Sequence, residues 1–469
     1  MKTLIINFIL LLLFSSGCKK SEYLDAVPDQ SLRIPNTLEY LQAILDNKEQ
    51  MNGTIGFPVG ISPGIGEVSA DNYYASKTFL KIMPALTIST YIWSDDIYTT
   101  GLGLFNDWAL PYRAIYNANI VLDGLQTLEI RNDQQGFYNN ARGSALFYRA
   151  HMLYQLAQVF TPHYNALTAE NIPGLPLRMA SDINERISRS TVKETYDQVI
   201  TDLLEARYLL PVNVTFKTRP SLPAVFALLA RTYLTMGKFE EALKYADSCL
   251  QITNVLVDYN NTPNTSSWTL KETNDEVLFT SALISTGDLL YNYLARIDSN
   301  LYKSYESADL RKGLYFSDAS IYGEAESYYF KGSYIGGTNA AILFGGLATD
   351  EVYLIKAECN ARVGNIKDAM SSLNVLLRNR YESGLFTDMV AGNMEEALQI
   401  ILQERRKELI FRGLRWTDLR RLNATGENIT IIREVDGIKY TLQPNSAHYT
   451  FLFPPDVMAF HPDWEQNPR

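Results

Sequence analysis

The chain has 469 residues, of which 46% are hydrophobic and 20% charged, and this composition excludes a disordered protein. Its formal net charge of −10 argues against a general nucleic-acid binder, because such proteins neutralise phosphates with an excess of Lys and Arg. The length permits two or three domains, or one large domain built from repeats.

Residues 1–17 have the pattern of an export signal. Lys2 precedes an apolar run, Leu4 to Phe14, that is too short to cross a bilayer comfortably, and the small residues SSG follow it. Cys18 comes next, in an arrangement that resembles the lipobox of bacterial lipoproteins, although Ser15 stands where Leu is commonest. We expect Cys18 to be lipidated; an ordinary secretory signal and a cysteine present by chance are the alternatives.

A loop-rich region follows the first predicted helix. After a polar tether, residues 36–47 (NTLEYLQAILDN) predict a helix. Residues 51–104 instead contain Gly, Pro, Ser, Thr and aromatic residues with no sustained helical period. A loop region of this length in a compact protein is usually functional or disordered, and the aromatic content argues against disorder.

Helices are predicted in series after this region. Residues 105–130 and 137–160 carry apolar side chains at three- and four-residue spacing, which is typical of helices packed on one face. A third helix is expected from Thr191 to Pro211. Ser190 or Thr191 can cap it, and Glu194 stands three residues after Thr191 as in a capping box.

Two helical pairs form an internal repeat. Aligning LPAVFALLARTYLTMGKFEEALKYADSCL with DEVYLIKAECNARVGNIKDAMSSLNVLL places Ala230 on Ala357 and Gly237 on Gly364. Small residues there let antiparallel helices approach closely, and the glycine ends the first helix. The spacing resembles the tetratricopeptide repeat, although Asn360 replaces an aromatic residue in the second copy. The copies lie 127 residues apart, so they are not a continuous solenoid by sequence.

A second non-periodic region, residues 253–349, separates the two copies, and the tail from Asn423 to Arg469 reads as loop and short strand. Cys249 and Cys359 lie in the predicted helices of the two copies. One disulfide between them is possible on count alone, but buried free thiols are favoured, and no cysteine or histidine spacing matches a metal site.

Residues 403–422 (QERRKELIFRGLRWTDLRRL) carry charges of alternating sign at helical spacing. Glu404 with Lys407, Glu408 with Arg412, and Asp418 with Arg421 are expected to pair on a helix face, each contributing a few tenths of a kcal/mol. Gly413 is expected to separate two helices. Trp416 is expected to fill the core and not to contact a ligand.

The sequence contains no pattern of a known catalytic site. None of the four histidines lies in HExxH or with spaced cysteines, and GxSxG and GxxxxGK[ST] are absent. Asp95 and Asp96 are adjacent acids, but neighbours on a loop point in different directions, and we interpret them as solvated or capping residues. No metal or cofactor is expected.

The two loop-rich regions favour binding of a sugar or peptide, which needs rings for stacking and polar groups for orientation. Trp93, Tyr91 and Tyr98 are candidates in the first region. The candidates in the second region are Trp268, Tyr291, Tyr293, Tyr328, Tyr329 and Tyr334.

Several segments together resemble the SusD/RagB family of outer-membrane lipoproteins. They include ARGSALFYRAHMLYQLAQVF with IPGLPL, SRSTVKETYDQVITDLLEARYLLP, the two repeat pairs, ERRKELIFRGLRWTDLRR and the ending PP…HPDWEQNP, in that order. Two features depart from the family: Arg412-Gly413 stands where Glu-Gly is usual, and Lys19 and Lys20 follow the cysteine where surface lipoproteins often carry acids.

The resemblance implies a mainly α fold: a tetratricopeptide-repeat-like helical scaffold with large loop-rich regions and minor short β-strands. It implies a signal peptide, residues 1–17, and one SusD-like domain, residues 18–469, with halves 18–215 and 216–469. The ligand would bind in the loop regions, about 51–104 and 253–349, and Trp93 is the best single candidate.

By the same resemblance, the protein is a non-enzymatic lipoprotein at the outer membrane of a Gram-negative bacterium, exposed on the cell surface. It would capture a glycan and deliver it to a SusC-like TonB-dependent barrel, with no nucleic-acid partner. A RagB-like peptide binder is the main alternative. A cell-envelope glycoside hydrolase and a repeat protein that serves only as an assembly scaffold are further alternatives.

Overall fold

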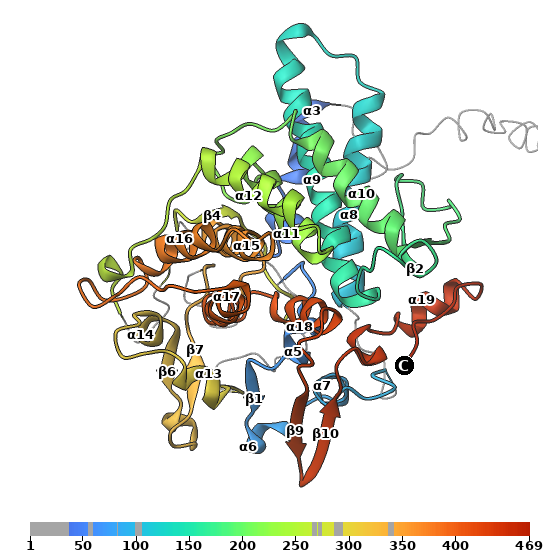
Figure 1. Cartoon of the computed structure of the whole chain (residues 1–469). Coiled ribbons are helices and arrows are strands. Elements are labelled where there is room, and N and C mark those ends of the chain that lie inside the picture. The colour runs from blue at the N-terminus through green and yellow to red at the C-terminus, as the bar shows by residue number, and fades with distance from the viewer. Residues whose placement is uncertain are drawn as a thin grey trace, which may run out of the picture.

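Helices form most of the regular structure, and the strands are short (Figure 1). The computed structural model describes residues 37–54, 60–81, 83–98, 106–264, 270, 274–285, 294–335 and 342–469. Within these ranges every sheet has two strands. The expected mainly α fold, with a tetratricopeptide-repeat-like scaffold and minor strands, is confirmed.

The N-terminal part of the scaffold is built on two long helices, α8 (Asn106–Gln126) and α9 (Gln135–Phe160), which pack against each other. The short helices α3 (Leu38–Leu45) and α4 (Lys48–Met51) contact α8, and α10 (Val192–Ala206) packs on α9. Most of α9 is buried, because helices cover it on several sides. The predicted capping box at the start of α10 is present.

The repeat pairs are α11 (Leu222–Thr235) with α12 (Phe239–Ile252), and α15 (Thr349–Arg362) with α16 (Ile366–Leu377). Gly237 and Gly364 both have positive φ, 72° and 89°, and each stands in the turn after the first helix of its pair. Helix α12 packs on α15, so the two copies are adjacent in space although the sequence separates them. Cys249 and Cys359 are buried free thiols, as expected.

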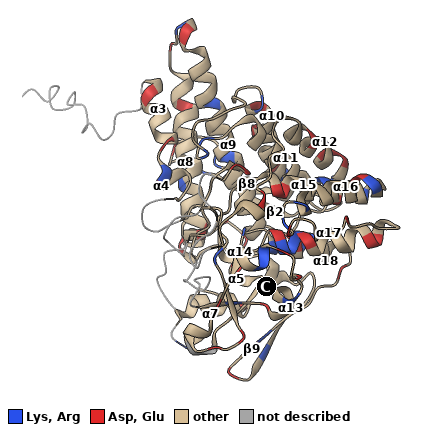
Figure 2. Cartoon of the chain, turned by 90° about the vertical axis from the view of Figure 1, so that its left-hand side faces the viewer, with Lys and Arg blue, Asp and Glu red and all other residues tan. Residues whose placement is uncertain are grey.

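Helices α17 (Met394–Glu408) and α18 (Arg415–Ala424) contain the charged stretch (Figure 2). Gly413, at φ +72°, separates them as expected. Trp416 is 1% exposed and packs on Tyr449, with ring centroids 4.7 Å apart, so its predicted core role is confirmed.

The charges of this stretch are buried, and two of the three expected pairs form. Glu404 with Lys407 and Asp418 with Arg421 do form ion pairs, each at 2.8 Å. The third expected pair is wrong: Arg412 binds Asp350 at 3.0 Å, and Glu408 turns to other partners.

The partners of Glu408 come from outside the stretch, which explains the difference. Arg311 and Arg380 contact its carboxylate at 3.0 and 2.7 Å. Both arginines are fully buried, and Arg311 stands on α14 (Arg311–Tyr315), in the second loop-rich region. That region packs over α17, so the charged face of this helix lies in the interior of the protein.

Both loop-rich regions contain short elements that no hydrophobic period had indicated. The first holds α5 (Ile65–Ser69), β1 (Tyr73–Ala75), α6 (Lys77–Leu80) and α7 (Ala85–Tyr91). The second holds β4 (Val277–Phe279), β5 (Ala295–Ile297), α13 (Ser299–Lys303), α14, β6 (Phe316–Asp318), β7 (Tyr328–Phe330) and β8 (Leu347–Ala348). β1 pairs with β5 antiparallel, so the two regions are joined by a sheet.

Two further two-stranded sheets and a short helix add to the scaffold. β2 (Pro173–Pro176) pairs with β3 (Arg189–Thr191). In the tail, β9 (Ile431–Val435) and β10 (Ile438–Leu442) form a hairpin that projects beside β1 in Figure 1, and α19 (Pro455–Phe460) follows. The positive φ angles of Asp436 and Gly437 fit the tight two-residue turn of such a hairpin.

Candidate functional site

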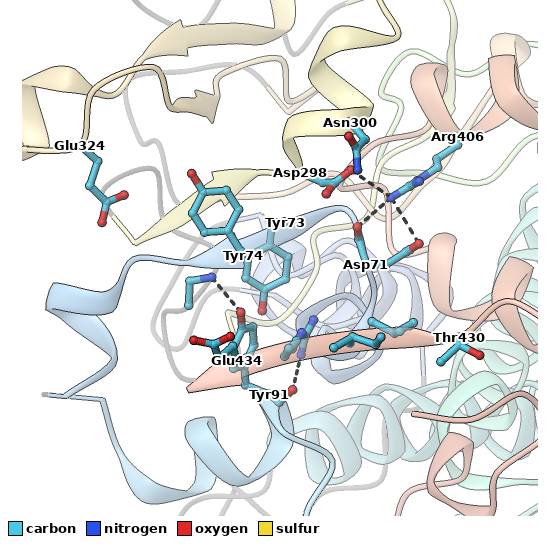
Figure 3. A pocket seen from close by; sticks show the side chains of 14 residues that line it. Asp71, Tyr73, Tyr74, Tyr91, Asp298, Asn300, Glu324, Arg406, Thr430 and Glu434 are labelled. Atoms are coloured by element: carbon cyan, nitrogen blue, oxygen red, sulfur yellow. Dashed lines mark hydrogen bonds and ion pairs between the residues drawn. The ribbon is translucent and has the colours of Figure 1, made fainter. Parts of the chain in front are cut away.

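A cleft of about 700 Å³ lies where the two loop-rich regions meet the β9–β10 hairpin (Figure 3). Strand β1 forms one wall and β9 another, and the start of α13 closes one end. Its lining residues are Asp71, Tyr73, Tyr74, Ala75, Tyr91, Asp298, Asn300, Glu324, Arg406, Thr430, Ile431, Ile432, Arg433 and Glu434. The volume is in the range of pockets that hold small ligands.

Tyr74 supplies the open ring of the cleft. On β1 the side chains alternate, so Tyr73 is buried while Tyr74 is 38% exposed. The antiparallel register with β5 sets Tyr74 opposite Arg296 and fixes its position. Burial and the nearby carboxylate of Glu324 raise the pKa of Tyr74, so its hydroxyl stays protonated and can donate a hydrogen bond.

Arg433 of β9 lies under the rings of the first loop-rich region. Its guanidinium donates to the backbone carbonyls of Tyr91, Val68 and Ala70. The guanidinium carbon also lies 3.8 Å from the ring centroid of Tyr91 and 4.6 Å from that of Trp93. Arg433 therefore fastens the hairpin to the cleft wall.

Ion pairs build the other end of the cleft. Asp71 binds Arg415 at 2.7 Å and Arg406 at 3.2 Å, and Arg406 also lies 3.9 Å from Asp298. Burial raises the pKa of Asp71, but the charges of Arg415 and Arg406 outweigh it and hold the pKa well below its usual range. Asp71 is thus ionised and paired at any physiological pH.

Glu324 and Glu434 stand at the end of the cleft away from these pairs in Figure 3. Glu324 binds the buried Arg296 at 2.9 Å and accepts from the Ser76 hydroxyl. Glu434 is exposed on β9, directly across the hairpin from Lys439.

The predicted binding residues of the first region are mostly part of the core. Tyr91 lines the cleft but is 3% exposed, and its hydroxyl accepts from the N–H of Ala75 at 3.0 Å. Trp93 is 7% exposed, and its indole N–H donates to the carbonyl of Ser69 at 3.0 Å. Arg433 also lies 4.6 Å from its ring centroid, so the structure shows the Trp93 ring covered, and its role as a ligand contact stays a prediction.

Tyr98 is partly buried, and its hydroxyl donates to the carbonyl of Leu452 at 3.0 Å, outside the cleft. Its position ties the first loop-rich region to the C-terminal tail.

Among the candidates of the second region, Tyr334 is buried, and its hydroxyl donates to Glu276 at 2.6 Å. Tyr328 stacks on Tyr302 with ring centroids 3.6 Å apart, and Tyr329 packs edge-on with Tyr322. The structure does not place these rings on the cleft wall. Three further candidates lie outside the described residues: Trp268, Tyr291 and Tyr293.

Sequence reasoning missed Tyr74, Asp71, Arg406 and Arg433. The alternation in DNYYAS could have indicated Tyr74, since one of two adjacent tyrosines on a strand faces outward. Arg433 comes from the tail, more than 300 residues beyond the rings it contacts, and no local pattern reveals that contact.

The contacts of Asp95 and Asp96 agree with their interpretation as solvated or capping residues. Asp96 accepts from the backbone N–H of Tyr98, and Asp95 contacts Nε2 of His448 at 2.8 Å. The Nδ1 of His448 lies 3.0 Å from the Ser446 hydroxyl, which gives the order Ser-His-Asp. The Asp95 side chain is 90% exposed, however, so this surface contact lacks the water-excluded setting that nucleophilic catalysis requires.

Two family models match the chain. The first, described as starch-binding associating with outer membrane, matches residues 22–234, and the second, the SusD family, matches residues 348–452. The chain belongs to the SusD/RagB family.

Three proteins similar to this SusD/RagB-family chain have sequence identities of 21–24% to it. SusD-like protein P2 of Formosa agariphila is 24% identical over 378 residues, covering 68% of this chain and 72% of that protein. The crystal structure of a SusD superfamily protein from Bacteroides thetaiotaomicron has a TM-score of 0.74 at 21% identity, covering 92% of this chain and all of the other.

A putative sugar binding protein from Bacteroides vulgatus is similar in structure, with a TM-score of 0.72 at 22% identity. The match covers 93% of this chain and 99% of the Bacteroides vulgatus chain. At such identities the likeness establishes the fold.

The described part of this SusD/RagB-family chain shows neither a membrane-spanning helix nor a metal-binding cluster. None of its helices there has the length and apolar character that a bilayer crossing requires. Within the same residues, no three His, Cys, Asp or Glu side chains gather in a way that could hold a metal ion.

Proposed function

We propose that this SusD-type protein captures an oligosaccharide in the cleft between β1 and β9 and releases it unchanged to a SusC-like TonB-dependent barrel. The cleft itself carries the proposal: a ring open on one side, Tyr74, faces a cavity with polar groups such as Asn300 and Glu434. Sugars need this combination of a stacking face and orienting hydrogen bonds. The description of the matching family and the names of similar proteins support the same reading.

The proposed location is the outer membrane, with the lipid on Cys18 as anchor and the folded part exposed on the cell surface. A short tether would keep the cleft close to the barrel and raise its effective concentration there. We further propose that residues 18–469 act as one SusD-like unit, with halves 18–215 and 216–469. One core cluster containing both Phe147 and Trp416 supports this.

A peptide ligand is the second candidate, and one observation favours it. Both walls of the cleft are strands with a single neighbour among the described residues: β1 pairs with β5 alone, and β9 with β10 alone. An unpaired strand edge can accept an extended peptide as an added strand.

The test is a binding array of neutral and acidic oligosaccharides together with peptides, using the mature protein. We expect oligosaccharide binding without product formation, and about a tenfold loss of affinity in Tyr74→Ala, because the variant loses the only open ring on β1. Tyr208→Ala is the matched control, since Tyr208 is 76% exposed on the surface outside the cleft. Peptide-only binding would favour the second candidate, and sustained hydrolysis would contradict both.

The proposed anchor is tested separately. Cys18→Ala should release the mature protein from the membrane fraction, because the lipid is attached through that thiol. Retention of the variant in washed membranes would refute the anchor without affecting the proposal for the cleft.

A further inference from the structure

The carboxylates of the cleft bear on the chemical class of its ligand. Four of them line it, from Asp71, Asp298, Glu324 and Glu434, against the two guanidinium groups of Arg406 and Arg433. Arg415 and Arg296 behind the wall pair with Asp71 and Glu324, so the carboxylates left with the least compensation are Asp298 and Glu434. On this basis, and resting on the proposed function of the cleft, we infer that it takes neutral oligosaccharides and rejects those that carry carboxylates or sulfates.

Arg433 is not available to an anionic ligand. Only 5% of its surface is exposed, and its guanidinium donates to three backbone carbonyls while aromatic rings cover it. Recruiting it would break these hydrogen bonds and detach the hairpin from the cleft wall.

Arg406 is equally committed. It contacts the carboxylates of Asp71 and Asp298, and it donates to the backbone carbonyl of Asp71 at 2.7 Å and to the side chain of Asn72 at 3.2 Å. An anionic group would have to displace Asp71, whose low pKa reflects how strongly the arginines hold it as a carboxylate.

Two of the carboxylates are more exposed than either cation. The side chain of Asp298 is 32% exposed and Glu434 is exposed on the strand, against 24% for the side chain of Arg406 and 5% for Arg433. Exposed carboxylates in a cleft repel an approaching anion, and the net charge of −10 acts in the same direction. An anionic ligand is therefore repelled on approach and finds no free cation at the described cleft walls.

Neutral sugars meet no such penalty. The Tyr74 ring and Ile432, 64% exposed on β9, offer apolar surface to the C–H faces of a sugar ring. Carboxylates such as Glu434 accept hydrogen bonds from sugar hydroxyls. A sulfated sugar or a uronate has fewer hydroxyl groups to donate, because an acidic group replaces one of them.

The experiment compares matched glycans at low salt. The probes are sets of three oligosaccharides, one set each for starch, xylan and mannan. Each set contains the neutral chain, the same chain with its primary or substituent groups converted to carboxylates, and the methyl ester of that acid as a neutral control. We expect the neutral chain and the methyl ester of a bound glycan to bind at least about tenfold more tightly than the acid.

The double variant Asp298→Asn/Glu434→Gln should narrow this preference to about threefold or less, because two like charges at short range are removed. Asp298 caps α13 by accepting from the N–H of Leu301, and Asn preserves that cap. Glu129→Gln, an exposed carboxylate in the connection after α8, is the matched control and should leave the preference unchanged.

An acid that binds as tightly as its ester, with binding lost in Tyr74→Ala, would overturn the inference while leaving the capture function intact. If none of the glycans bind, the proposed function fails and the inference falls with it. A preference that persists unchanged in the double variant would also overturn it, since the selectivity would then not come from these charges.

Discussion

At the scale of single residues, Glu67 connects the cleft wall to the scaffold. Its carboxylate accepts from the side chain of Asn72 at 3.2 Å and from the backbone N–H of Gly413 at 3.0 Å. Burial raises the pKa of Glu67 to about 7, and the hydrogen bonds from Asn72 and Gly413 only partly oppose that rise. Asn72 stands between two lining residues, Asp71 and Tyr73, so this carboxyl is hydrogen-bonded to the segment that forms the cleft wall.

A raised carboxyl pKa makes stability depend on pH in a defined direction. The folded state binds the proton of Glu67 more tightly than the unfolded chain does, so this contribution is complete below about pH 4.5 and is lost as the pH rises through about 7. Urea unfolding of wild type should therefore lose up to about 3 kcal/mol between pH 5 and pH 8 from this group.

Glu67→Gln should remove this contribution to the slope of unfolding free energy against pH, because glutamine does not titrate. The expectation concerns the slope and holds whatever the absolute stability of the variant. Glu129→Gln, at the exposed connection between α8 and α9, should keep the wild-type slope. Identical slopes in wild type and Glu67→Gln would show that Glu67 is ionised in the folded protein throughout this range.

At the scale of elements, the junction between α17 and α18 positions several groups of the cleft. Arg406 at the end of α17 and Arg415 at the start of α18 both bind Asp71, and Gly413 between the helices donates to Glu67. The turn must bring the two arginines to one carboxylate. Its backbone passes through positive φ at Phe411 and Gly413 to do so.

Two glycines make a matched test of this junction. Gly413 and Gly364 both have positive φ, but an added Cβ at Gly413 would lie 2.8 Å from the Leu283 side chain, whereas at Gly364 nothing lies within 4 Å. Gly364→Ala should cost about 1 kcal/mol from backbone strain alone. Gly413→Ala should cost at least about 1 kcal/mol more, measured by urea unfolding, and should weaken ligand binding as well. Equal costs would mean that Leu283 moves aside freely.

The sequence predicted the elements whose pattern is local. The repeat pairs, α8 to α10 and the capping box at Thr191 follow from periodicity and capping residues that lie within one segment. The cleft depends instead on pairing between β1 and β5 and on Arg433 entering from the tail, contacts across more than 200 residues. Trp93 illustrates the limit: its loop composition suggested exposure, and only the tertiary contact with Arg433 shows that the ring is covered.

At the scale of the whole molecule, a buried ionic network joins the second loop-rich region to the scaffold. Arg380, which follows α16, binds Glu276 at 2.8 Å and Glu408 of α17 at 2.7 Å, and all three side chains are fully buried. Burial raises the pKa of Glu276 to about 7 although the charge of Arg380 opposes it. Tyr334 donates to the same carboxyl, so one of the predicted ligand rings serves this network.

Removing the shared cation should be strongly destabilising. Arg380→Met leaves the buried carboxylate of Glu276 without its cation and leaves Glu408 with Arg311 alone, and it should cost about 3–5 kcal/mol at pH 8. The loss should be smaller at pH 5, where Glu276 can take up a proton. Arg378→Met is the neighbouring control: its pair with Asp388 is about half exposed, and its loss should change stability by less than about 1 kcal/mol. A small effect of Arg380→Met at pH 8 would show that water reaches the network.

The packing of α12 on α15 has a consequence for how such proteins diversify. Residues 253–348 leave the scaffold after α12 and return to it at α15, two helices that are direct neighbours, so the ends of this long excursion are held close together. Closing a longer or shorter chain between fixed ends costs little, since each doubling of loop length adds only about 0.6 kcal/mol. The segment that supplies Asp298, Asn300 and Glu324 to the cleft can thus change in length and sequence while the helical stack below it keeps its register, so this part of the cleft can be exchanged to suit new ligands.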